Sequence, residues 1–145
     1  MQKGIFLQIS FAFTICGSFS LGIIALALND TFAAPSPTAR EQCYSATNIL
    51  GVISLATAFI IYLCVIILKK DGNRRLIITV FLLGCIGLLF YAIACGCYFS
   101  SNPPLGAWLF SALWIAVGVV GIGLDFLFIN PLDIRNGSRF KAETL

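Results

Sequence analysis

KKDGNRR, residues 69–75, places four basic side chains in one short polar segment in the middle of the chain. It separates two long uncharged segments, Thr47–Leu68 and Leu76–Phe99. Basic side chains beside membrane spans stay on the cytoplasmic side. The stretch therefore predicts a cytoplasmic loop between two transmembrane helices, anchored by Lys69, Lys70, Arg74 and Arg75.

The composition of the whole chain agrees with a membrane protein. Of its 145 residues, 59% are hydrophobic and 10% are charged, and the mean hydropathy is +0.99. A soluble domain of this size needs more polar surface. The chain has no His, the commonest catalytic base and metal ligand, and no basic patch with interleaved aromatics. We therefore expect no metal, no cofactor and no nucleic-acid partner.

Four apolar runs are long enough to cross a bilayer: Gly4–Leu28, Thr47–Leu68, Leu76–Phe99 and Trp108–Ile129. About 20 helical residues span a hydrocarbon core of roughly 30 Å, and lipid forces such runs to be helices. The first run imitates a signal peptide but exceeds the usual apolar length of about 7–15 residues. The sequence predicts an all-α integral membrane four-helix bundle with short loops, one domain over residues 1–145, and a short tail over residues 130–145.

The basic residues predict the orientation of this bundle. With a cytoplasmic N-terminus, eight of the nine lie inside: Lys3, Lys69, Lys70, Arg74, Arg75, Arg135, Arg139 and Lys141. Arg40 lies outside. An excess of basic residues on one side of a membrane protein is typical of its cytoplasmic side, so we expect both termini to be cytoplasmic.

Small residues recur at helical spacings in every run, and they predict how the helices pack. The residues concerned are Ser10, Gly22, Gly51, Ser54, Gly84, Gly87, Ser111, Gly118 and Gly121. They could form a dimerisation face or pack the four helices against one another. Because all four runs carry such a stripe, we favour packing within the bundle.

Three of the six cysteines are expected on the outer side: Cys43, Cys95 and Cys97. One interpretation is a structural disulfide from Cys43 to Cys95 or Cys97. The alternative is a membrane thiol oxidoreductase that uses Cys95-Gly96-Cys97 as a redox pair. We favour the structural bond, because short loops at a membrane edge gain from a cross-link.

Asp125 is the charged residue inside a predicted span, which makes it a candidate proton or cation site. Its place near the inner end of the fourth run favours a structural role instead. The residue follows Gly121 by four positions, so we expect it to point into the bundle. There it would pair with Gln8 or with a basic side chain such as Lys3.

In layout, the chain resembles the MARVEL-type (claudin/MARVEL-like) tetraspan membrane proteins: four spans, short loops and cytoplasmic termini. The resemblance implies a non-enzymatic role in membrane apposition, trafficking or junction organisation, through lateral packing with other membrane proteins in the plasma membrane or the secretory pathway. An accessory subunit of a channel, receptor or larger complex is the alternative. The oxidoreductase and a carrier that uses Asp125 are further alternatives.

Overall fold

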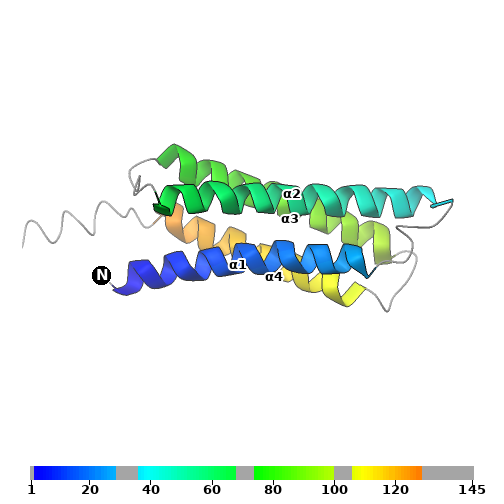
Figure 1. Cartoon of the computed structure of the whole chain (residues 1–145), viewed down its shortest axis with the longest axis horizontal. Helices are drawn as coiled ribbons and strands as arrows, with labels where there is room; N and C mark the ends of the chain where they lie inside the picture. The colour runs from blue at the N-terminus through cyan, green and yellow to red at the C-terminus, as the bar shows by residue number, and fades with distance from the viewer. Residues whose placement is uncertain (1, 29–35, 68–73, 100–105, 129–145) are drawn as a thin grey trace, which may run out of the picture.

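The part of the chain that the structure describes forms four helices, and each runs antiparallel to the next one in sequence (Figure 1). The computed structural model describes residues 2–28, 36–67, 74–99 and 106–128. Its helices are α1 (Gln2–Ala27), α2 (Ala39–Ile67), α3 (Arg74–Phe99) and α4 (Gly106–Phe128). All regular structure in these residues is α-helical. The end of α1, the start of α2, the end of α3 and the start of α4 lie together, and we call this the Cys43 end. The opposite end is the Arg75 end.

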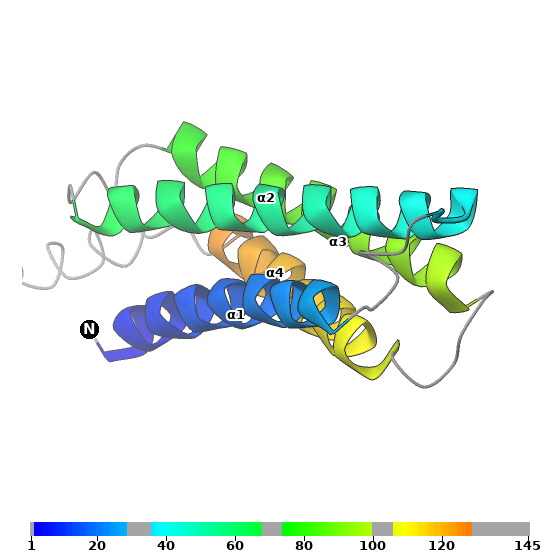
Figure 2. The same ribbon diagram turned by 45° about the vertical axis from the view of Figure 1, so that its right-hand side comes forward.

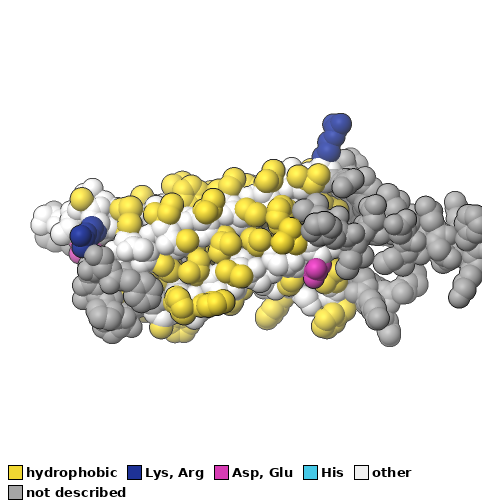
Figure 3. All heavy atoms as spheres, turned by 180° about the vertical axis from the view of Figure 1, so that it is seen from behind, with side chains coloured by type: hydrophobic (Ala, Val, Ile, Leu, Met, Phe, Trp, Pro, Cys, Tyr) yellow, Lys and Arg dark blue, Asp and Glu magenta, His cyan; other side chains and the backbone are white. Residues whose placement is uncertain are grey.

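Each helix contains a stretch long and apolar enough to cross a membrane. The stretches are Phe6–Ala27, Ala39–Ile67, Arg75–Tyr98 and Ala107–Asp125. On the face shown in Figure 3, charged side chains occur only towards the two ends, with a hydrophobic band between them. The described charged side chains are Arg40 and Glu41 at the Cys43 end, and Arg75 and Asp125 at the Arg75 end. The fold is therefore that of a multi-pass membrane protein.

The helices form a ring in which each packs against its neighbours in sequence and α1 closes on α4. The contact between α2 and α3 is the most extensive, and Figure 2 shows α3 running behind α2. In the described residues, the buried positions alternate between spacings of three and four, with one addition, Cys95, next to Ala94 in α3. They are Phe11, Ile15, Ser18, Gly22 and Ala25 in α1; Tyr44, Asn48, Gly51, Leu55, Ala58, Tyr62 and Val65 in α2; Val80, Gly84, Gly87, Tyr91, Ala94, Cys95 and Tyr98 in α3; and Leu109, Ala112, Ala116, Val119 and Gly123 in α4.

This repeat has a direct consequence for how the helices cross. An average spacing of 3.5 residues keeps one seam of each helix facing its neighbours when the helices wind around each other with a left-handed twist. Interaxial angles near 20° and interlocking side chains are typical of such bundles. Each helix thus has one narrow inner seam, and the rest of its apolar surface faces outwards.

α2 begins eight residues earlier than the sequence predicts, at Ala39 instead of Thr47. Its start is a capping box: the Glu41 amide donates to Thr38 Oγ1 at 3.4 Å, and the Thr38 amide donates to Glu41 Oε2 at 2.7 Å. These bonds satisfy amides that a helix start otherwise leaves without partners. The helix therefore includes residues 39–46, which precede the apolar run Thr47–Leu68. The other helix limits lie within two residues of the expected ones.

Candidate functional site

Side-chain hydrogen bonds tie α1 to the other helices. Tyr62 of α2 donates to the Gln8 carbonyl at 3.1 Å, and Tyr91 of α3 donates to the Ser18 carbonyl at 3.3 Å. The Ser18 hydroxyl in turn donates to the Ala112 carbonyl of α4 at 3.0 Å. Bonds of this kind fix the relative depth of helices that apolar contacts alone would let slide.

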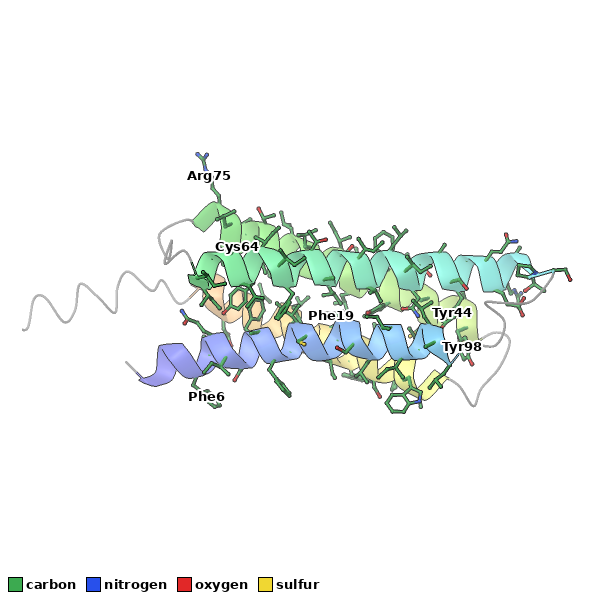
Figure 4. The ribbon with its side chains drawn as sticks, in the orientation of Figure 1. Phe6, Phe19, Tyr44, Cys64, Arg75 and Tyr98 are labelled. Atoms are coloured by element: carbon green, nitrogen blue, oxygen red, sulfur yellow. The ribbon has the colours of Figure 1, made fainter. Side chains whose placement is uncertain are left out.

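Near the Cys43 end the same pattern continues between α2 and α1. The Tyr44 hydroxyl donates to the Ala25 carbonyl at 3.2 Å. The fully buried Asn48 amide donates to the Gly22 carbonyl at 3.5 Å and to the Tyr44 hydroxyl at 3.3 Å. The Tyr44 and Tyr98 rings lie side by side, with centroids 5.1 Å apart (Figure 4). Both tyrosines therefore belong to the interior and not to an aromatic belt at the membrane surface.

Glycines make room for the large buried side chains. A Cβ at Gly51 would lie 2.7 Å from the Tyr91 ring, and a Cβ at Gly22 would collide with the Tyr91 hydroxyl. A Cβ at Gly87 would lie 2.8 Å from Leu55, and one at Gly84 3.3 Å from Val119. These four residues, all expected to pack helices, lie at close helix contacts.

The small residues of α4 are divided between two faces. Ser111 and Gly121 are exposed, and a Cβ at Gly121 would meet nothing within 4 Å. The expectation that these two residues pack within the bundle is wrong, because α4 carries a second small stripe. That stripe, Ala112–Ala116–Val119–Gly123, fills the inner seam, and a Cβ at Gly123 would lie 2.9 Å from Phe81.

Among the other expected packing residues, Gly118 is half-buried. A Cβ there would be 3.5 Å from Thr14 of α1. Ser10 and Ser54 are half-buried. The Ser54 hydroxyl donates to the Leu50 carbonyl of its own helix at 2.8 Å. Neither serine lies on the buried seam.

Asp125 is exposed in the last turn of α4. Because it follows the exposed Gly121 by four residues, it points outwards together with that glycine. The expectation that Asp125 points into the bundle is therefore wrong. Gln8 is half-buried, and its backbone carbonyl accepts the Tyr62 hydrogen bond. The side chain of Lys3 lies outside the described residues.

One face of α4 thus combines exposed small residues with an exposed carboxylate. We call the set Ser111, Trp114, Gly121 and Asp125 the α4 outer stripe; all four are exposed. They recur at spacings of three, seven and four residues, which place them on one side of a helix. The Ser111 hydroxyl donates to the Ala107 carbonyl at 2.8 Å within its own helix. The stripe is a surface against which another helix can pack.

Of the three cysteines that the sequence places at one end of the bundle, two are in contact in the structure. Cys43 Sγ and Cys97 Sγ lie 2.9 Å apart, between α2 and α3. Cys95 is 7% exposed and belongs to the buried core. Both members of the close pair are half-buried. The structure therefore brings Cys97, and not Cys95, against Cys43.

The predicted topology anchor is described only in part. Lys69 and Lys70 lie outside the described residues, as does the Arg74 side chain, although Arg74 begins α3. Arg75 is exposed and points away from the bundle (Figure 4). Within the described part of the chain, no three His, Cys, Asp or Glu side chains gather as metal ligands would.

Comparison of the chain with protein-family models, curated proteins and solved structures finds no match.

Proposed function

We propose that this chain is a non-enzymatic membrane protein that packs laterally against other membrane proteins. The observation that carries the proposal is the α4 outer stripe, where Ser111 and Gly121 face away from the bundle. Helix association in lipid depends on close backbone approach, which small residues permit. A glycine whose side-chain position is open on the outside of a bundle offers such an approach to a helix from another protein.

Asp125 supports a partner of defined chemistry. An exposed carboxylate near the end of a span is costly in lipid unless it reaches water or a cation. A Lys or Arg at the corresponding depth of a neighbouring helix would relieve that cost. We infer that the partner is a transmembrane helix with small residues along one face and a basic residue near the same membrane surface.

The same carboxylate disfavours a symmetric pair of identical chains packed through α4. Two copies in one membrane have the same orientation, so a two-fold dimer would bring one Asp125 towards the other. Like charges in so apolar a setting repel strongly. This favours a partner of different sequence, which is the role of an accessory subunit of a channel, receptor or larger membrane complex.

The MARVEL-like layout leads to the same class of function by another route. It supports a role in organising a membrane, a junction or a trafficking complex, in the plasma membrane or the secretory pathway. A thiol oxidoreductase based on Cys95 and Cys97 has less support. Residues two positions apart on a helix point about 160° apart, and Cys95 lies in the core while Cys97 lies against Cys43.

The test compares two glycine variants of the full chain. Gly121→Leu adds bulk to the α4 outer stripe, and Gly17→Leu adds the same bulk on α1 at a glycine whose Cβ would also meet nothing within 4 Å. The proteins that co-purify in mild detergent are quantified by mass spectrometry. We expect Gly121→Leu to lose specific membrane partners about tenfold, the equivalent of roughly 1.4 kcal/mol, while Gly17→Leu retains them.

Two further measurements distinguish the loss of a partner from the loss of the fold. The thermal unfolding midpoint in detergent should be the same for both variants, because neither position has a neighbour within 4 Å. Asp125→Asn should weaken the same partners, and these partners should carry a basic residue at the matching depth. Equal partner recovery from Gly121→Leu and the native chain would contradict the proposed surface.

A further inference from the structure

We propose that Cys43 and Cys97 form an intramolecular disulfide that locks α2 to α3 at the Cys43 end. The two sulfur atoms are 2.9 Å apart, whereas a disulfide joins them at about 2.05 Å. A shift of less than about 1 Å therefore suffices. The residues are 54 positions apart in sequence, so the contact is set by the packing of the two helices and not by local chain geometry.

The positions of the two cysteines on α3 show why Cys97, and not Cys95, is the partner of Cys43. Cys95 precedes Cys97 by two residues on α3 and points about 160° away from it around the helix. It packs into the buried core, where it is 7% exposed. The Cys43–Cys97 contact thus resolves the two pairings that the sequence leaves open.

The pair also lies where an oxidant can reach it. Cys43 is the fifth residue of α2, four positions after the start of a helix whose cap, Thr38 to Glu41, is polar and exposed. Cys97 is the third residue from the end of α3. Both thiols are half-buried and not enclosed. A thiol–disulfide reagent in the aqueous phase can therefore approach the pair from the Cys43 end.

The oxidant that the reaction needs is a second disulfide, such as glutathione disulfide. One of the two thiols loses its proton and attacks a glutathione sulfur, which breaks the glutathione S–S bond and releases one glutathione thiol. The second protein thiol then attacks the mixed disulfide, forms the Cys43–Cys97 bond and releases the second glutathione thiol. The protein loses two protons and two electrons, and glutathione disulfide gains the same two protons and two electrons.

The experiment uses purified full-length protein in mild detergent, fully reduced and then exposed to glutathione disulfide. Free thiols are counted after denaturation by the mass added per bound maleimide. With six cysteines and one internal bond, we expect four reactive thiols before reduction and six after it. The intact mass should show the loss of two hydrogens and not an added glutathionyl group.

Three variants identify the partners. Cys43→Ser and Cys97→Ser should each show five reactive thiols with or without reduction. Cys95→Ser is the matched control and should keep the bond, with three reactive thiols before reduction and five after it. Six reactive thiols in the oxidised native chain, a bond that Cys95→Ser abolishes, or a cross-link between two chains would overturn the proposal. Peptide mapping of the native chain decides the question even if a variant fails to fold.

This inference does not depend on the proposed packing function. Thiol counting reports on the Cys43 end within one chain, whereas the Gly121→Leu experiment reports on the outside of α4. Either result can fail while the other stands.

Discussion

Tyr91 is the residue around which α1, α2 and α3 meet. It is fully buried and its hydroxyl donates to the Ser18 carbonyl of α1. Its ring fills the space that the missing side chain of Gly51 leaves on α2. A rigid aromatic ring held at its polar tip cannot rotate away as a long aliphatic chain could. The position of the Tyr91 ring therefore requires a glycine at position 51.

Gly51→Ala should destabilise the bundle by about 1–3 kcal/mol, because an added methyl group in a filled core forces side chains off their preferred positions. The new Cβ would lie 2.7 Å from two atoms of the Tyr91 ring. Unfolding in detergent, followed by circular dichroism, measures the change.

The control for this prediction is Gly17→Ala. A Cβ at Gly17 meets nothing within 4 Å, so this variant should be unchanged or more stable by about 0.5–1 kcal/mol, as alanine in a helix usually is relative to glycine. If both variants unfold like the native chain, the contact between Gly51 and Tyr91 is looser than the structure indicates.

At the scale of the helices, the start of α2 depends on two polar residues. Thr38 and Glu41 exchange hydrogen bonds in the capping box. Thr38→Ala should cost about 1 kcal/mol locally, which corresponds to roughly fivefold faster exchange of the amides in the first turn. Hydrogen–deuterium exchange over residues 39–42 measures this effect.

Thr57→Ala makes the same chemical change in the middle of the same helix. Its hydroxyl donates to the Ile53 carbonyl of its own helix, on an exposed face. We expect it to leave exchange over residues 39–42 as in the native chain. Equal exchange in the Thr38→Ala variant and the native chain would show that the capping box does not hold the first turn.

The helices themselves could be predicted from the sequence because length and hydrophobicity suffice for that. The start of α2 could have been found from Thr38-Ala39-Arg40-Glu41, a capping-box sequence that apolar runs do not reveal. The inner seams could not be found by hydrophobicity, because lipid is as apolar as the core and both faces of a span look alike. Small residues are a better signal, but α4 has them on two faces.

Because the core face and the lipid face of a span look alike, the sequence predicted some of the candidate site residues correctly and others wrongly. Four expected packing glycines lie at tight contacts because each faces a large side chain, as Gly87 faces Leu55. The sequence predicts an interior position for Asp125 because it follows Gly121 by four residues, and in the structure both residues are exposed. Because the predicted position of Asp125 depends on that of Gly121, the wrong face for Gly121 on α4 also gives the wrong face for Asp125.

At the scale of the whole molecule, the remaining question is which end faces the cytoplasm. α2 has 29 residues, or about 43 Å at 1.5 Å per residue, which exceeds a hydrocarbon core of roughly 30 Å. If α2 spans the bilayer, positions just before and just after it lie on opposite sides. The basic residues after α2 predict that the Arg75 end is cytoplasmic.

Single cysteines at Ser36 and Gly72, in a background without the native thiols, test this prediction. A membrane-impermeant maleimide should label Ser36→Cys in sealed cells and Gly72→Cys only after permeabilisation. Labelling of both from outside would contradict a membrane-spanning α2. The reverse pattern would keep the span but invert the orientation. It would also place Cys43 and Cys97 in the reducing cytosol, where a structural disulfide rarely persists. One labelling experiment thus examines both the direction of the bundle and the compartment in which its two thiols could be joined.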